Sequence, residues 1–233
     1  MSALLLGSIS TVADTSELQR QAFNEAFAAH GLDWRWDRDD YRAMLAKNGG
    51  QDRIAEYARS RGQEVDAAAV HQTKSEIFRK RLATAGLAPR PGVADTIKAA
   101  QDHGWKVGLV TTTAAENVAA LLARLHPQVS DQDFDVIVDA ARVESPKPDP
   151  AAYVFALQAL TEAPGDCVAV EDNVGGVEAA VAAGVPCVAF PNENTGQGDF
   201  PAAAEQVGRL DFAALQALTT GSAASGAARR QEA

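Results

Sequence analysis

The amino-acid sequence predicts an α/β fold: a Rossmann-like, doubly wound parallel sheet core with an inserted all-helical cap domain. Short apolar runs alternate with helical patterns along most of the chain, and each run is apolar on both faces, as in a parallel sheet covered by helices. One long stretch near the N-terminus carries only helical patterns. The length of 233 residues suits one large domain or a core with a smaller second domain.

The expected strands are five short apolar runs. They are Ala3–Leu6, Val107–Val110, Val136–Val138, Cys167–Val170 and Cys187–Phe190. The helical stretches between them are Gly92–His103, Ala115–Arg124, Pro150–Leu160 and Val174–Ala183. Gly104 and Gly184 follow two of these helices, at the position where glycine commonly ends a helix. This alternation predicts a doubly wound core.

The stretch from Ser16 to about Leu87 interrupts the alternation and predicts the cap. Its first helix shows one apolar stripe, which Gly31 closes, made of Leu18, Ala22, Phe23, Ala26 and Phe27. Further helical patterns cover Tyr41–Ala46, Gln51–Ser60 and Val65–Ala85. The predicted organisation is a core of residues 1–15 and 88–218, a cap of residues 16–87, and a disordered tail of residues 219–233, which is rich in Ala, Gly and Ser.

The formal net charge of −10 limits the classes of partner. Nucleic acid and anionic membranes are bound through basic patches, so this charge argues against both. The apolar run Ala3–Leu6 is too short for a signal peptide or a membrane span, and we therefore expect a cytoplasmic protein. Cys167 and Cys187 begin apolar runs and are expected to be buried thiols rather than a disulfide or a metal pair.

Residues that can bind an anion or a metal follow the expected strands, where ligands bind in open α/β sheets. The segments are Gly7-Ser8-Ile9-Ser10, Thr111, Pro146-Lys147-Pro148 and Glu171-Asp172. A hydroxyl and backbone N–H groups at a helix start hold phosphate oxygens, and a lysine between prolines adds a positive charge for the same anion. Paired carboxylates suit Mg²⁺, which takes oxygen ligands. The segments predict a phosphate and metal site in one crevice.

This order and spacing resembles the haloacid dehalogenase (HAD) superfamily, and within it the branch of CbbY-type sugar-phosphate phosphatases and β-phosphoglucomutase. The resemblance runs from Ala3 to about Phe212. The family's first motif, Asp-x-Asp-Gly-Thr-Leu-x-Asp-Thr, matches residues 7–15, and its second motif matches residues 107–113. The third and fourth match Lys147-Pro148-Asp149-Pro150 and Val170-Glu171-Asp172-Asn173 with Gly176-Val177. In the cap, Gly49-Gly50-x-x-Arg53-Ile54 is similar to a substrate loop of CbbY-type enzymes.

The resemblance implies roles for the matched residues. The first aspartate of the family attacks phosphorus and binds Mg²⁺, and the second is the general acid and base. Gly7 and Ile9 occupy these two positions, so no catalytic residue is intact and the Mg²⁺ of the family is doubtful here. The implied phosphate-binding residues are Thr111, Thr112 and Lys147, the remnant metal ligands are Glu171 and Asp172, and the cap contacts are Gly49, Gly50 and Arg53.

Three functional hypotheses follow. The first is a catalytically impaired member of the hydrolase family, a pseudoenzyme that binds phosphate or a sugar phosphate without metal and without turnover. The second is an active Mg²⁺-dependent phosphatase or phosphomutase with a non-standard nucleophile, for which Ser8 and Ser10 are the nearby hydroxyls. The third is a scaffold protein with a vestigial site. Restoring the carboxylates with Gly7→Asp and Ile9→Asp is expected to return some activity if the other site residues are in position.

Overall fold

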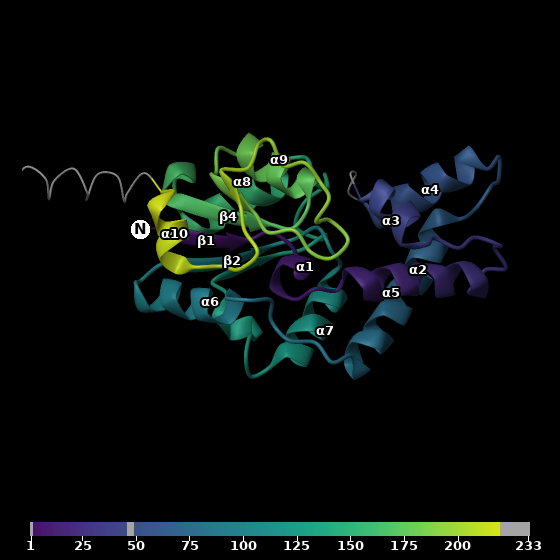
Figure 1. Ribbon diagram of the computed structural model, residues 1–233, viewed down its shortest axis with the longest axis horizontal. Helices are drawn as coiled ribbons and strands as arrows, with labels where there is room; N and C mark the ends of the chain where they lie inside the picture. The colour runs from purple at the N-terminus through teal and green to yellow at the C-terminus, as the bar shows by residue number, and fades with distance from the viewer. Residues whose placement is uncertain (1, 46–48, 220–233) are drawn as a thin grey trace, which may run out of the picture.

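The computed structural model describes residues 2–45 and 49–219 and places their strands in a six-stranded sheet (Figure 1). The order is β3-β2-β1-β4-β5-β6, and every neighbouring pair is parallel. The strands are β1 (Ala3–Leu6), β2 (Lys106–Val110), β3 (Val136–Val138), β4 (Cys167–Glu171), β5 (Cys187–Ala189) and β6 (Glu205–Gln206). The predicted parallel α/β core is confirmed. The sequence pattern missed β6 because both its residues are polar and exposed.

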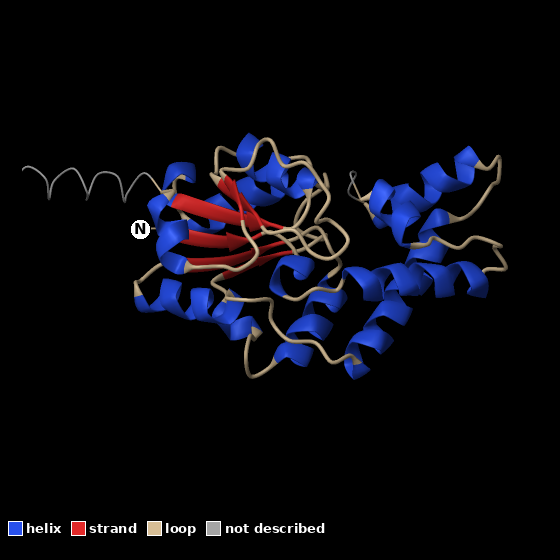
Figure 2. Ribbon diagram, viewed as in Figure 1, coloured by secondary structure: helices blue, strands red, loops and turns tan. Residues whose placement is uncertain are grey.

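Helices cover both faces of the sheet (Figure 2). Alternate residues of β1 pack against the helices on opposite faces. Leu4 and Leu6 pack into a cluster with residues of α6, α7 and α10, whereas Ala3 and Leu5 pack on the opposite face with residues of α8 and α9. These helices are α6 (Val93–Asp102), α7 (Ala115–Leu125), α8 (Ala151–Leu160), α9 (Val174–Ala182) and α10 (Phe212–Ala217). A strand buried on both faces reads as a continuous apolar run, which is why β1 was recognisable.

The cap is formed by helices α2 to α5, which follow α1 (Ile9–Val12) in the chain. They are α2 (Ser16–Ala29), α3 (Arg38–Met44), α4 (Gly50–Ser60) and α5 (Ala67–Thr84). The cap has its own aromatic core, in which Phe27 and Trp36 pack edge to face with ring centroids 4.6 Å apart. Of the predicted stripe, Phe23, Ala26 and Phe27 belong to this cap core, whereas Ala22 and the partly buried Leu18 pack in the cluster that includes residues of the sheet. Helix α3 begins before the predicted Tyr41, since the Asp37 side chain caps it by accepting from the Asp40 N–H.

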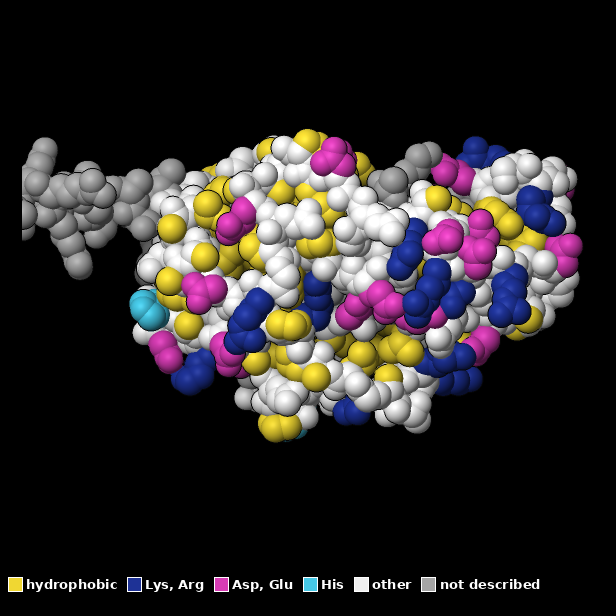
Figure 3. All heavy atoms as spheres, viewed as in Figure 1, with side chains coloured by type: hydrophobic (Ala, Val, Ile, Leu, Met, Phe, Trp, Pro, Cys, Tyr) yellow, Lys and Arg dark blue, Asp and Glu magenta, His cyan; other side chains and the backbone are white. Residues whose placement is uncertain are grey.

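A short helix, α1 (Ile9–Val12), follows β1 and leads into the cap, which faces the carboxyl ends of the strands (Figures 1 and 2). Polar contacts tie cap and core together. Arg38 of α3 forms a 2.8 Å ion pair with Glu193 of the core, and Arg79 of α5 donates to the Asn117 side chain of α7 over 3.0 Å. On the face shown in Figure 3, Lys and Arg side chains are interleaved with Asp and Glu over the cap.

Cys167 and Cys187 are buried free thiols. Thr219, the first residue of the predicted tail, is buried and its hydroxyl donates to the Gln216 carbonyl over 2.9 Å. The rest of that predicted tail, like Ala46 at the end of one predicted cap helix, lies outside the described residues. Within residues 2–45 and 49–219, every helix is too short or too polar to cross a membrane.

Candidate functional site

A cleft of about 280 Å³ opens between the cap and the carboxyl ends of the strands. Most of the predicted site residues line it: Gly7, Ile9, Gly49, Gly50, Arg53, Thr111, Thr112, Lys147 and Asp172. The structure therefore brings together segments from both the core and the cap. Glu171 does not line the cleft but lies buried behind it. Other residues of the cleft wall, among them Gln19, His71, Lys74 and Asn192, were not predicted as binding residues.

The space beside Gly7 is filled by the Glu171 side chain. Gly7 follows β1 directly, and its N–H donates to the Val170 carbonyl of β4 over 2.8 Å. A Cβ placed on Gly7 would lie 2.1 Å from Cδ of Glu171 and 2.5 Å from the Tyr153 hydroxyl oxygen. On the other side of the carboxylate, a Cβ on Gly176 would lie 2.3 Å from the same Cδ. Glu171 thus lies against two glycines, and an aspartate side chain at position 7 would fit only if Glu171 moved.

Lys147 is buried and directs its ammonium group at protein oxygens. Its Nζ donates to Oε1 of Glu171 and to the Val110 carbonyl, each over 2.6 Å, and also to the Gly7 carbonyl. An ammonium has three N–H donors, so these contacts use all of them. Lys147 can therefore reach a phosphate only by exchanging one of these partners.

Glu171 accepts hydrogen bonds at one of its two carboxylate oxygens. Its Oε1 accepts from Nζ of Lys147 and, over 2.8 Å, from the Tyr153 hydroxyl. Burial raises the pKa of Glu171 above its ordinary value, while the positive charge of Lys147 acts in the opposite direction. Burial likewise raises the pKa of Tyr153. The second carboxylate oxygen, Oε2, is buried without a hydrogen-bond partner in the described structure. The pair Lys147–Glu171 is a buried, mutually neutralised ion pair.

Thr111 and Thr112 follow β2 and line the cleft. The Thr111 N–H donates to the Val138 carbonyl of β3 over 2.9 Å, which fixes the backbone at this strand end. Its hydroxyl oxygen accepts from the Thr113 N–H over 3.1 Å. Both threonines therefore contribute to the core side of the cleft wall.

Asp172 lies on the cleft wall within a hydrogen-bond network. Its Oδ1 accepts from the Ser8 hydroxyl over 2.7 Å and from the Asn173 amide over 3.1 Å. Its Oδ2 accepts from the Asn192 amide over 2.6 Å. Ile9, next to Ser8, is buried and apolar, so it has no proton to exchange with a substrate.

Arg53 and Lys74 bring positive charge to the cap side of the cleft. The Arg53 guanidinium lies over the rings of Tyr41 and Phe23, with centroid distances of 5.7 and 6.0 Å, and its Nε donates to the Met44 carbonyl over 3.1 Å. Lys74 Nζ lies 4.6 Å from the Phe23 ring centroid and donates to Oε1 of Gln19 over 3.0 Å. Burial lowers the pKa of Lys74 to about 7.

The two predicted cap glycines have separate structural reasons. Gly49 has a φ of +92°, which side chains other than glycine rarely adopt. A Cβ on Gly50 would lie 2.6 Å from Nε2 of His71, so Gly50 leaves room for that imidazole. Burial lowers the pKa of His71 to about 4.

Lys74 could have been found from the sequence. It stands four residues after Val70 and four before Phe78, on the apolar side of α5, and all three are buried. A lysine on the buried side of an amphipathic helix is unusual, because burial without a counter-charge opposes its ionisation.

The donor set does not fit Mg²⁺, the metal that hydrolases of the HAD family generally use. This ion requires near-octahedral oxygen ligation, commonly from carboxylates and water. Gly7 and Ile9 supply no carboxylate, and both oxygens of Asp172 already accept hydrogen bonds. The ammonium of Lys147 lies against Glu171. In the described part of the chain, no group of three or more His, Cys, Asp or Glu side chains is placed to hold a metal.

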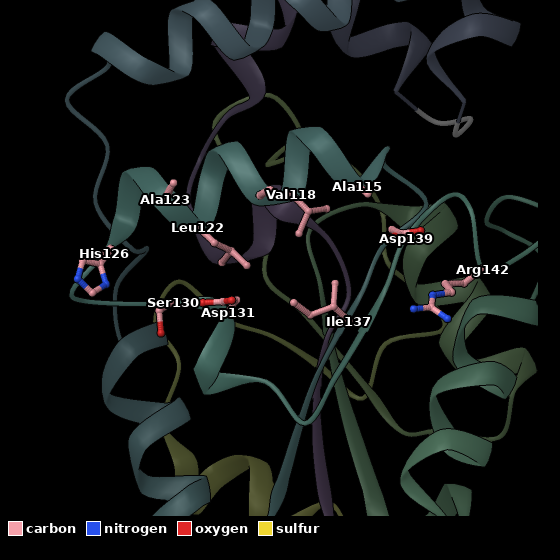
Figure 4. Close-up of a pocket in the computed structure, with 11 residues that line it drawn as sticks. Ala115, Val118, Leu122, Ala123, His126, Ser130, Asp131, Ile137, Asp139 and Arg142 are labelled. Carbon is pink, nitrogen blue, oxygen red and sulfur yellow. The ribbon is translucent and has the colours of Figure 1, made fainter.

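A second hollow, of about 520 Å³, lies between α7 and edge strand β3 (Figure 4). Val118, Leu122 and Ile137 make its wall apolar. Figure 4 shows its polar groups at opposite ends, with Asp131 far from Asp139. Because these groups do not converge on one point, we place the functional site in the cleft under the cap.

Comparison with known proteins identifies the family to which this chain belongs. The family model of haloacid dehalogenase-like hydrolases matches residues 9–184. The CbbY protein of Rhodobacter capsulatus is 38% identical over 221 residues, which cover 94% of this chain and 97% of that protein. The crystal structure of CbbY from Rhodobacter sphaeroides in complex with phosphate has a TM-score of 0.82 at 38% identity, and the match covers 89% of this chain and 94% of that one. A mutant of that CbbY, in complex with xylulose 1,5-bisphosphate, matches with the same TM-score of 0.82. The chain therefore belongs to the haloacid dehalogenase-like hydrolases, and within them it is CbbY-like.

Proposed function

We propose that this chain binds a phosphorylated sugar in the cleft under the cap and does not hydrolyse it through an aspartyl-phosphate. One observation carries the proposal: Glu171 fills the space beside Gly7 in which a nucleophilic carboxylate would stand. The nucleophile is thus missing, the space beside Gly7 is occupied, and the charge of Lys147 is paired with Glu171.

The chemistry of the cleft wall supports a sugar phosphate as the ligand class. The core side offers the hydroxyls of Ser8, Thr111 and Thr112, and the cap side offers the cations Arg53 and Lys74. Hydroxyls and charged donors bind phosphate oxygens, and a sugar fits between two such groups. The CbbY of Rhodobacter sphaeroides forms a complex with phosphate, and a mutant of it forms a complex with xylulose 1,5-bisphosphate, a phosphorylated sugar.

Binding is expected to be independent of Mg²⁺. Without carboxylates at positions 7 and 9, the cleft repels a phosphate dianion less than an intact HAD site does. The cations that attract the anion belong to the protein itself. Binding that required Mg²⁺ would contradict this part of the proposal.

The test is a panel of sugar phosphates, assayed with and without Mg²⁺ on protein free of contaminating phosphatase. We expect catalytic phosphate release at the background rate and a ligand-dependent rise in melting temperature that persists in EDTA. Multiple turnovers that disappear in Asp172→Ala would overturn the claim that the chain does not hydrolyse its ligand. A melting temperature that no phosphorylated ligand changes would overturn the binding claim and favour a scaffold role.

Replacing Lys74 by methionine is expected to stabilise the free protein and to weaken ligand binding. The pKa of Lys74 in the folded state, about 7, is below its usual 10.5, so the folded state binds fewer protons than the unfolded state between these pH values. The buried charge of Lys74 therefore destabilises the folded state most below pH 7, and this destabilisation becomes smaller as the pH rises. At pH 6, Lys74→Met should raise the free energy of unfolding by roughly 3 kcal/mol, and by less at pH 9.

The same substitution removes a cation from the cleft, so the affinity for a sugar phosphate should fall about tenfold. Lys80 lies on the same helix but is exposed, and Lys80→Met is the matched control. The control should leave both the unfolding free energy and the affinity nearly unchanged. If Lys74→Met behaved like the control in both measurements, Lys74 would have no part in binding.

A further inference from the structure

Ser8 and Asp172 are arranged as a nucleophile and its base. The Ser8 hydroxyl donates to Oδ1 of Asp172 over 2.7 Å. The amide of Asn192 donates to Oδ2 over 2.6 Å and holds the carboxylate in place. A hydroxyl that donates to a base, with the base oriented by a third group, is the general arrangement of an activated nucleophile.

The role of Ser8 as a helix cap does not account for this contact. Capping of α1 uses the Ser8 oxygen as an acceptor, from the Thr11 N–H at 3.0 Å. The hydroxyl proton is not needed for the cap, and it is directed at a residue 164 positions away in the sequence. Ser10 provides the contrast, because its hydroxyl contacts the Thr15 hydroxyl at 2.7 Å rather than a carboxylate.

Ser8 is also where a bound phosphate can be reached. It is partly exposed and lines the same cleft as Thr111, Thr112 and Lys147. The carboxylate at Asp172 is buried apart from its cleft-facing edge, so the network is shielded from bulk water. A low-dielectric surrounding strengthens the interaction between a hydroxyl and its carboxylate partner.

We propose that Ser8 accepts a phosphoryl group from an acyl phosphate bound in the cleft and becomes phosphoserine. The proposal rests on the proposed function only in that the cleft must admit a phosphate. Oγ of Ser8 forms a bond to phosphorus, the bond between phosphorus and the acyl oxygen breaks, and the Ser8 proton passes to Oδ1 of Asp172. The leaving group departs as a carboxylate, and the proton then exchanges with solvent.

Because Ile9 cannot act as an acid, an acyl phosphate suits this site as phosphoryl donor better than a sugar phosphate does. A sugar alkoxide needs a proton when it leaves, and Ile9 cannot supply one. A carboxylate leaves without a proton because it is a weak base. The product is a simple phosphate ester, and no second carboxylate stands at position 9 to activate water against it. The transfer is therefore expected to stop after one phosphoryl group per chain, which is compatible with the lack of turnover in the proposed function.

The experiment uses the full chain and acetyl phosphate, with and without Mg²⁺, followed by intact-mass measurement and peptide mapping. We expect a mass gain of one phosphoryl group, located on Ser8. Asp172→Asn should slow labelling about 100-fold, the scale of lost general-base catalysis. Ser8→Asn should abolish labelling and still fold, because asparagine retains an oxygen that can cap α1. Ser60→Ala, at an exposed serine that does not line the cleft, should keep the label.

Parallel melting curves with inorganic phosphate separate the two claims. No label on a protein that phosphate stabilises would overturn the role of Ser8 and leave the proposed function standing. No label, together with no stabilisation by inorganic phosphate or by any of the sugar phosphates, would overturn both. A label on another residue, or labelling that persists in Ser8→Asn, would show that Ser8 is not the acceptor. Labelling at the same rate in Asp172→Asn would remove Asp172 as the base.

Discussion

Gly7→Asp is expected to destabilise the protein and to leave it without phosphatase activity. The new Cβ would lie 2.1 Å from Cδ of Glu171 and 2.5 Å from the Tyr153 hydroxyl oxygen, so the surrounding residues must move. It would also add a second carboxylate beside a buried one. Overpacking together with an unpaired buried charge should lower the free energy of unfolding by about 3 kcal/mol or more. Urea denaturation of the variant and the parent measures the difference.

Gly86 supplies the matched control, because a Cβ on it would meet nothing within 4 Å and it is exposed. Gly86→Asp should change the stability by less than about 0.5 kcal/mol. Combining Gly7→Asp with Glu171→Ala should be more stable than Gly7→Asp alone, because the alanine makes room and the new aspartate can pair with Lys147. A Gly7→Asp variant as stable as the parent would show that Glu171 does not block position 7.

This prediction revises the expectation from the sequence that Gly7→Asp with Ile9→Asp returns some activity. Thr111, Lys147 and Asp172 do lie around one cleft. The obstacle is Glu171, because it occupies the space that the restored side chain needs. We therefore expect phosphate release by that double variant to stay at background unless Glu171 is replaced as well.

Lys147→Met is expected to lower the free energy of unfolding by about 3–5 kcal/mol at pH 8, because it leaves Glu171 buried without its counter-charge. Glu171 is 0% exposed, so water cannot replace the lost partner. The double variant Lys147→Met with Glu171→Gln removes both charges and should recover most of the loss. Urea denaturation at fixed ionic strength measures all three proteins.

The loss of unfolding free energy in Lys147→Met should depend on pH in a defined direction. Burial already raises the pKa of Glu171, and removing Lys147 raises it further, since the lysine charge opposes the shift. An acid with a raised folded-state pKa binds more protons when folded, so the variant gains stability as the pH falls through that pKa. The loss in Lys147→Met should therefore be smaller at pH 5 than at pH 8.

Lys98 is exposed on α6 and pairs with Asp102, so Lys98→Met should cost little at either pH. Equal losses in Lys147→Met at both pH values, or a loss no larger than that of Lys98→Met, would show that the buried pair does not contribute as proposed.

Much of the fold was predictable because its signals are local. A strand buried on both faces leaves an apolar run in the sequence, as β1 does, and an amphipathic helix leaves a stripe, as α2 does. The exposed strand β6 left no such signal. The replacement of the family's two aspartates by Gly7 and Ile9 could also be recognised in the sequence, since a motif is defined by residue type and spacing.

The sequence by itself thus determined the fold class, the family and the loss of the carboxylates at positions 7 and 9. Only the tertiary structure decided what fills the vacated space, where the donors of Lys147 point, and which base faces Ser8. Glu171 and Gly7 are brought together because β1 and β4 are neighbours in the sheet, and Ser8 meets Asp172 at the same strand ends. Such contacts join residues more than 150 positions apart, and they depend on packing that no local pattern records.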